Sequence, residues 1–303
     1  MSSEQRRPPQ RPHGEHEVRG LAFRDEQAEQ AEQDERTGSE GAGTGQGLTA
    51  APRPLGRRPV RRLTWLKLLF MPVLLAVVVG ATLIWITNAD LDSISRNSLA
   101  HDATQTALWQ HIQLTAISTF FVLIISIPLG IALTRSALRR ASPYVVALAN
   151  IGQATPAIGL LALLVIWLGT GREPALIGIT IYAVLPVLSN TIAGLRATDP
   201  GLIDAARGIG MSAPGVLFRV ELPLAVPLIL AGVRTALVLN VGTATLATFG
   251  GGGGLGDLIN AGITNQRMPV LILGSVLTVA LALLVDWLAS IAEVLLRPRG
   301  LET

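Results

Sequence analysis

The sequence predicts an all-α, polytopic membrane protein with six transmembrane helices, preceded by a disordered tail. Half of its 303 residues are hydrophobic and only 15% are charged, and the mean hydropathy is +0.48. Six apolar runs follow one another, each long enough to cross about 30 Å of hydrocarbon, which takes about 20 helical residues. We expect helices because lipid offers the backbone no hydrogen-bond partner.

The first 62 residues differ in composition from the rest of the chain. They are rich in Pro, Gly, Gln, Glu and Arg, with too little apolar surface to offset the entropy of ordering a chain. The first apolar run begins only near Leu63 and is too long for the core of a cleavable signal peptide. We therefore expect a disordered cytoplasmic tail over residues 1–62 and a single transmembrane domain over residues 63–299.

The six apolar runs are the expected membrane spans. They cover Leu63–Thr87, Leu108–Thr134, Pro143–Leu168, Ala175–Leu195, Leu224–Phe249 and Val270–Leu296. Pro156 and Pro186 lie inside two of them and are expected to kink their helices. The glycine run Gly250–Gly254 lacks the lysine and the strand-to-helix setting of a phosphate-binding loop. It is predicted to be a flexible external loop or a reentrant turn.

Basic residues predict the orientation in the membrane. If the amino terminus is inside, the cytoplasmic segments from residue 57 onward carry twelve arginines and the opposite side carries three, namely Arg96, Arg172 and Arg267. Loops with an excess of basic residues stay in the cytoplasm. Both termini are therefore predicted to be cytoplasmic, and so is the segment between the fourth and fifth spans.

That segment, residues 199–223, has the signals of two short helices. Asp199 is a good N-cap with Pro200 at the first helical position. Gly210 can supply the left-handed residue that ends the first helix. Ser212 can cap a second short helix, which we expect Pro223 to interrupt.

The motif Asp204-Ala205-Ala206-Arg207-Gly208-Ile209-Gly210, followed by Val220-Glu221-Leu222-Pro223, resembles the EAA motif of ABC importer permeases, with Asp204 in place of the usual Glu. In that family the loop is a cytoplasmic coupling helix that docks on the ATP-hydrolysing subunit. The resemblance implies coupling roles for Asp204, Ala205, Ala206, Arg207, Gly210 and Pro223. Small alanines would let the helix seat deeply in a groove. The alternative is an ordinary connection between spans.

From about Leu108 to Ile263 the chain is similar to permeases of the osmoprotectant branch of ABC importers, which carry glycine betaine, carnitine, choline or related solutes such as proline. The resemblance implies a type I-like permease domain. It rests on stretches that include Ile127-Pro128-Leu129-Gly130-Ile131, Gln153-Ala154-Thr155-Pro156, Leu185-Pro186-Val187-Leu188, Ala231-Gly232-Val233-Arg234 and Gly253-Gly254-Leu255-Gly256-Asp257.

The same resemblance implies the partners. It predicts an ABC ATPase dimer, a second permease that is identical or paralogous, an extracytoplasmic solute-binding protein and the lipid bilayer, but no nucleic acid. ATP and Mg would bind the partner ATPase, and this chain would be a translocation subunit rather than an enzyme. The sequence agrees, because it contains no phosphate-binding loop, no cysteine and no pattern of a catalytic or metal site.

Polar residues inside spans are candidates for the solute path because they are costly in lipid. The candidates are Gln153, Thr155, Asn190, Asn240, Thr243 and Thr245. For each of them the alternative role is hydrogen bonding between packed helices.

Arg234 and Asp286 are predicted to pair because they lie at the same depth. Arg234 is 11 residues beyond Pro223 and Asp286 is 11 residues before Arg297. At about 1.5 Å per residue both charges lie roughly 16 Å from the cytoplasmic ends of their helices. The alternative is that either charge snorkels or reaches a water-filled cavity.

Two other functions stay open at this point. An ion-driven secondary transporter or channel would need several intramembrane carboxylates, whereas Asp286 is the one well inside a span. The other is an ABC importer permease for a different amino acid or an oxyanion.

Overall fold

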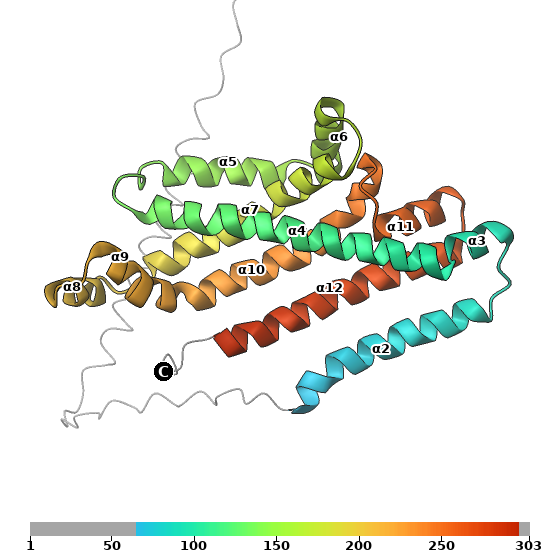
Figure 1. Ribbon diagram of the computed structural model, residues 1–303, viewed down its shortest axis with the longest axis horizontal. Coiled ribbons are helices and arrows are strands. Elements are labelled where there is room, and N and C mark those ends of the chain that lie inside the picture. The colour runs from blue at the N-terminus through green and yellow to red at the C-terminus, as the bar shows by residue number, and fades with distance from the viewer. Residues whose placement is uncertain (1–64, 297–303) are drawn as a thin grey trace, which may run out of the picture. The chain divides into compact units, whose positions relative to one another are not determined.

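The computed structural model describes residues 65–296, with side chains from Leu69 onward. The predicted disordered tail over residues 1–62 lies outside this part of the chain. Within it, every regular element is a helix (Figure 1). Five helices are long and apolar enough to cross a membrane, and a bent helix pair can supply a sixth span. The long helices are α2 (Trp65–Thr87), α4 (His101–Thr134), α7 (Arg172–Arg196), α10 (Leu222–Ala244) and α12 (Met268–Leu296).

The third predicted span is a broken helix. The run Pro143–Leu168 was expected to be one kinked span, but it forms α5 (Ser142–Ala154) and α6 (Ala157–Leu168), which meet at 95°. The proline at position 156 explains the break, since a proline disfavours helical backbone at the residue before it. Thr155 is accordingly extended, with a ψ of 135°.

Span α7 is at the centre of the bundle. It packs against α4 on one side and α10 on the other, and 56% of its most apolar stretch is buried. Its neighbours approach closely at glycines: a Cβ at Gly130 of α4 would lie 2.7 Å from the Thr191 side chain. In contrast, only 11% of the apolar stretch of α2 is buried. The rest of this chain therefore covers little of the first span.

Short elements occupy the two ends of the bundle. One end carries α8 (Pro200–Gly208) and α9 (Ala213–Val216), and we call it the 199–223 end (Figure 1). The opposite end carries α3 (Ser93–Ser98), the 3-10 helix η2 (Thr245–Gly250) and α11 (Leu255–Thr264). There an ion pair of 2.9 Å joins Asp92 to Arg267 at the start of α12. Hydrogen bonds from Ser95, together with Arg267, hold the pKa of the Asp92 carboxyl below its usual value.

The glycine run at the opposite end is a turn tied to α4. Gly251, Gly253 and Gly254 have φ angles between +76° and +101°, which side chains rarely tolerate. The Gly254 amide donates to Gln110 Oε1 at 3.1 Å. The Leu255 amide donates to Nδ1 of the buried His111 at 3.3 Å. Two consecutive residues of α4 therefore anchor this turn.

Candidate functional site

The first short helix of the 199–223 segment has well-formed ends. The Asp199 carboxylate caps α8 by accepting from the Gly201 amide at 2.8 Å. At the other end Gly210 has a φ of +90°. The Met211 amide donates to Ala206 O at 3.1 Å and the Gly210 amide to Arg207 O at 2.9 Å, the pair of bonds of a Schellman motif. The predicted N-cap and C-terminal glycine are both present.

The second short helix continues into the membrane span. Ser212 caps α9 by accepting from the Gly215 amide at 3.4 Å, as predicted. The expectation that Pro223 interrupts this helix was wrong, because the chain stays helical through a π turn, η1 (Leu217–Glu221), into α10. The Leu222 amide donates five residues back to Leu217 O. Pro223 follows two residues after the end of this π turn, inside the continuous helix, and it has no amide hydrogen to donate there.

Most of the predicted coupling residues lie on the outside of α8. Asp204, Ala205, Arg207 and Gly210 are exposed. Ala206 is an exception, because it is only 7% exposed. The expectation that the Ala206 side chain faces a groove of a partner is therefore corrected: it faces its own chain, where α8 contacts α9 and η1.

Large apolar side chains on this segment were not singled out from the sequence. Leu202, Ile209 and Phe218 are 50%, 82% and 66% exposed. They lie among the exposed charges Asp204 and Arg207. Exposed apolar groups rimmed by polar ones are typical of a protein interface. The signal available in the sequence was that large apolar residues, including these three, stand among charges and glycines in a segment outside the six apolar runs.

The polar residues predicted to line a solute path do not form one cluster. Asn240 is fully buried and donates to Thr119 Oγ1 on α4 at 2.8 Å, so it bonds between helices. Asn190 donates to Pro186 O at 2.8 Å within α7. The hydroxyls of Thr155, Thr243 and Thr245 donate to carbonyls three or four residues back in their own chain segments. Gln153 is half-buried near the end of α5.

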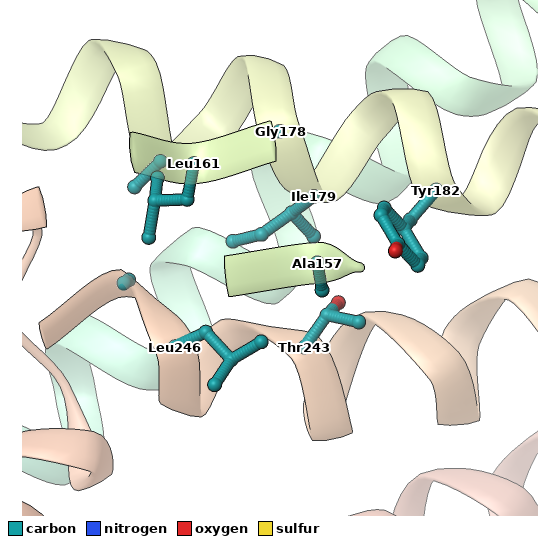
Figure 2. Close-up of a pocket in the computed structure, with 9 residues that line it drawn as sticks. Ala157, Leu161, Gly178, Ile179, Tyr182, Thr243 and Leu246 are labelled. Carbon is teal, nitrogen blue, oxygen red and sulfur yellow. The ribbon is translucent and has the colours of Figure 1, made fainter. Parts of the chain in front are cut away.

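Thr243 lies at a small cavity between α6, α7 and the end of α10. The cavity has a volume of about 20 Å³, and Figure 2 shows Thr243 and Tyr182 at its wall together with Ala157 and Leu161. Its lining is otherwise aliphatic. It adjoins the break between α5 and α6 and the change from α helix to 3-10 helix after Ala244. The break between α5 and α6 and the start of η2 therefore both lie beside this cavity.

Thr243 also borders an open groove along α10, which we call the α10 groove. The groove has a volume of about 630 Å³ and is lined by residues that include Thr235, Gly242 and the pair Arg234 and Asp286. Arg234 donates from Nε to Asp286 Oδ1 at 2.5 Å and from Nη2 to Oδ2 at 2.6 Å. The two residues are therefore partners across α10 and α12, in the arrangement that their equal depth predicts.

Two ion pairs were missed in the sequence, the Asp92–Arg267 pair described above and one at the 199–223 end. Arg135, at the end of α4, contacts Glu221 in the π turn before α10. Among the side chains from residue 69 to residue 296, no three His, Cys, Asp or Glu residues cluster closely enough to hold a metal ion. The described residues thus combine exposed apolar and charged groups at the 199–223 end with polar contacts between the spans.

The sequence of the domain matches a described protein family. The family of the binding-protein-dependent transport system inner membrane component matches residues 126–298, which is more than half of the chain. The chain belongs to this family. The matched region contains the 199–223 segment and the spans α7, α10 and α12. With its five long apolar helices and one bent pair, this inner membrane component is a multi-pass membrane protein.

Curated relatives of this inner membrane component are permeases of osmoprotectant transport systems. It is 37% identical over 194 residues to the choline transport system permease protein OpuBB of Bacillus subtilis, covering 64% of this chain and 88% of that protein. It is 37% identical over 193 residues to the glycine betaine/carnitine/choline permease OpuCB of the same organism, with the same coverage. The osmoprotectant import permease OsmY of Salmonella typhimurium is 41% identical over 179 residues, covering 59% of this chain and 76% of that protein.

Solved structures share the fold. A chain of the inward-facing MetNI methionine ABC transporter matches with a TM-score of 0.57 and 24% identity, covering 64% of this chain and 96% of that chain. A chain of an amino acid ABC transporter matches with a TM-score of 0.55 and 17% identity, covering 68% and 99%. The inner membrane component therefore has the fold of an ABC importer permease of type I.

Proposed function

We propose that this chain is the membrane-spanning permease subunit of an ATP-driven importer for compatible solutes such as glycine betaine, carnitine, choline or proline. One structural observation carries the proposal: a capped short helix projects from one end of a membrane bundle, with exposed Leu202, Ile209 and Phe218 among charged residues. Such a surface fits a protein groove. The osmoprotectant permeases among the relatives support the class of solute.

In this proposal α8 is the coupling helix, and ATP with Mg binds a partner ATPase dimer. The 199–223 end is cytoplasmic, as are both termini, and the opposite end meets an extracytoplasmic solute-binding protein. A second permease, identical or paralogous, completes the translocation path. Coupling requires that α8 interact differently with the two states of the ATPase, because a partner shifts an equilibrium only by its differential affinity.

The docking test uses Ala205→Arg, since Ala205 is exposed on α8. A bulky charge at the centre of an interface is expected to weaken co-purification with the ATPase by about tenfold or more. The matched control is Ala103→Arg, the same change at an exposed position of α4 near the opposite end. Intact co-purification of the Ala205→Arg variant would show that α8 does not dock.

The solute class is tested on the binding protein of the same transporter. Calorimetric titration with glycine betaine, carnitine, choline and proline is expected to give saturable binding of at least one of them. A quaternary ammonium would be recognised there by aromatic rings, because aromatic residues make up only 4% of this chain. Binding of only an oxyanion or an unrelated amino acid would contradict the proposed cargo.

A further inference from the structure

The end of α4 is tied to the base of α10 by an ion pair between residues 86 positions apart in the sequence. Arg135 donates from Nη1 to Glu221 Oε1 at 3.1 Å, and from Nη2 to Oε2. The side chain of Glu221 is only 6% exposed, whereas that of Arg135 is 37% exposed. The buried partner is thus the carboxylate, and the arginine reaches in from the surface.

The guanidinium of Arg135 is also held by its own helix. Its Nε donates to Ile131 O at 3.4 Å and to Thr134 Oγ1 at 3.3 Å. These acceptors lie in the last turn of α4, where carbonyls lack helical partners. The position of the guanidinium is therefore determined by α4 and by Glu221 together, with little freedom for the side chain to adjust alone.

Glu221 belongs to the segment that leads from α8 into the membrane. It is the last residue of the π turn, and the chain is helical without interruption from Ala213 through this turn into α10. A displacement of α9 would therefore move Glu221 with it, and the ion pair would carry that displacement across to α4.

Opening this ion pair would be unfavourable. A buried carboxylate that loses its charged partner is left without that compensation, and such a loss is strongly destabilising. If the ion pair opened in every transport cycle, this unfavourable free energy would be incurred each time. If the ion pair stays closed, the cost is avoided, and the end of α4 must move together with the 199–223 segment.

We propose that Arg135 and Glu221 form a permanently closed joint, through which movement of α8 by the ATPase reaches α4 as well as α10. The two residues are positioning residues for coupling and touch neither solute nor nucleotide. This inference rests on the proposed function of α8 as the coupling helix. The inference adds that movement of the coupling helix reaches two spans, α4 and α10.

The first test measures how many solute molecules are taken up per ATP hydrolysed. Transporters that carry Glu221→Gln or Arg135→Gln are expected to assemble with the ATPase and to hydrolyse ATP. Their ratio of solute taken up to ATP hydrolysed is expected to be about tenfold lower than that of wild type. The reversed pair, Arg135→Glu with Glu221→Arg, is expected to recover part of it. The control is Arg139→Gln, an exposed arginine at the same end of the bundle. An unchanged ratio in both single variants would overturn the proposal.

The second test separates a closed joint from one that opens. The chain contains no cysteine, so Arg135→Cys with Glu221→Cys places two unique thiols. Without cross-linking this variant is expected to show the low ratio of the single variants. Bridging the thiols with a short bifunctional reagent is expected to raise the ratio, because the joint is restored. Arrest of the residual uptake on bridging, or a normal ratio before bridging, would contradict a closed joint.

Failure of the inference is distinguishable from failure of the proposed function. If the wild-type chain takes up no solute with ATP and the partner subunits, the proposed function fails. If the wild-type chain transports and the variants at 135 and 221 do so with normal coupling, only the joint is refuted.

Discussion

Arg234 on α10 and Asp286 on α12 share two hydrogen bonds, of 2.5 Å and 2.6 Å, inside the membrane-spanning part of the chain. The two residues line the α10 groove, with side-chain exposures of 39% and 29%. A charge of this kind facing lipid alone would cost a few kcal/mol. The pair, and the open groove beside it, indicate that this face of α10 meets protein or water rather than lipid tails.

Removing one member of this pair is expected to destabilise the bundle. Asp286→Ala should lower the free energy of unfolding by about 1–3 kcal/mol, less than for a fully buried pair, because both side chains are partly exposed. The double change Arg234→Leu with Asp286→Leu should cost less than Asp286→Ala, since it removes both charges of the pair rather than one. Unfolding of the detergent-solubilised protein measures both, and equal stability of Asp286→Ala and wild type would contradict the account.

The contact between α7 and α10 is expected to be sensitive at Gly232. A Cβ there would lie 2.7 Å from Asn190 Cβ and 2.8 Å from Pro186 O, and the backbone oxygen cannot move aside. Gly232→Ala should therefore destabilise the bundle by about 1–3 kcal/mol through overpacking. Gly80→Ala on α2 is the matched control, because nothing lies within 4 Å of a Cβ at that position. Equal unfolding midpoints for the two variants would refute this packing.

The end of α8 depends on the left-handed backbone of Gly210. Gly210 has a φ of +90°, which a β-branched side chain disfavours. Gly210→Val is therefore expected to destabilise the local backbone by about 1–2 kcal/mol and to fray the last turn of α8. Co-purification with the ATPase should weaken accordingly. Gly208→Ala, inside α8 and with nothing within 4 Å of the added Cβ, should leave it unchanged. Normal assembly of the Gly210→Val transporter would speak against this role of the helix end.

The buried His111 is expected to hold α10 and α11 together. Because Nδ1 accepts from the Leu255 amide, the ring proton lies on Nε2 and is donated to Val241 O, at 3.0 Å. His111→Leu leaves both backbone groups without this partner and should cost about 2–6 kcal/mol, from two unsatisfied groups at roughly 1–3 kcal/mol each. Faster hydrogen exchange at the Leu255 amide is the measurement. Exchange as slow as in wild type would show that the imidazole does not protect it.

The main features of the fold could be predicted from the sequence because they depend on hydrophobic runs and local caps. Asp199, Ser212 and Gly210 cap or end helices through their neighbours in the chain, so a short stretch of sequence is enough to predict these roles. Pro156 indicated a kink, but its angle of 95° depends on how α6 packs, which local sequence does not contain. Pro223 was misjudged because the π turn before it was not expected.

The interactions between distant segments were harder to predict. Arg234 and Asp286 could be matched by depth, since each is a charge inside a long apolar run. Arg135 and Glu221 lie at the ends of runs, where charges are common, and nothing local indicates that Glu221 is buried. Ala206 is buried in its own chain, where α8 contacts α9 and η1. The Asp204–Gly210 motif suggested only a docking role for this residue, and its burial could not be predicted from the motif.

The most direct test of the account is uptake of labelled glycine betaine, carnitine, choline and proline into liposomes that contain this chain with its partner ATPase and binding protein. We predict uptake of at least one of them that requires Mg and hydrolysable ATP and is lost in the Ala205→Arg variant. Uptake that proceeds without ATP and follows an imposed ion gradient, or that is unaffected by Ala205→Arg, would contradict an importer driven through α8.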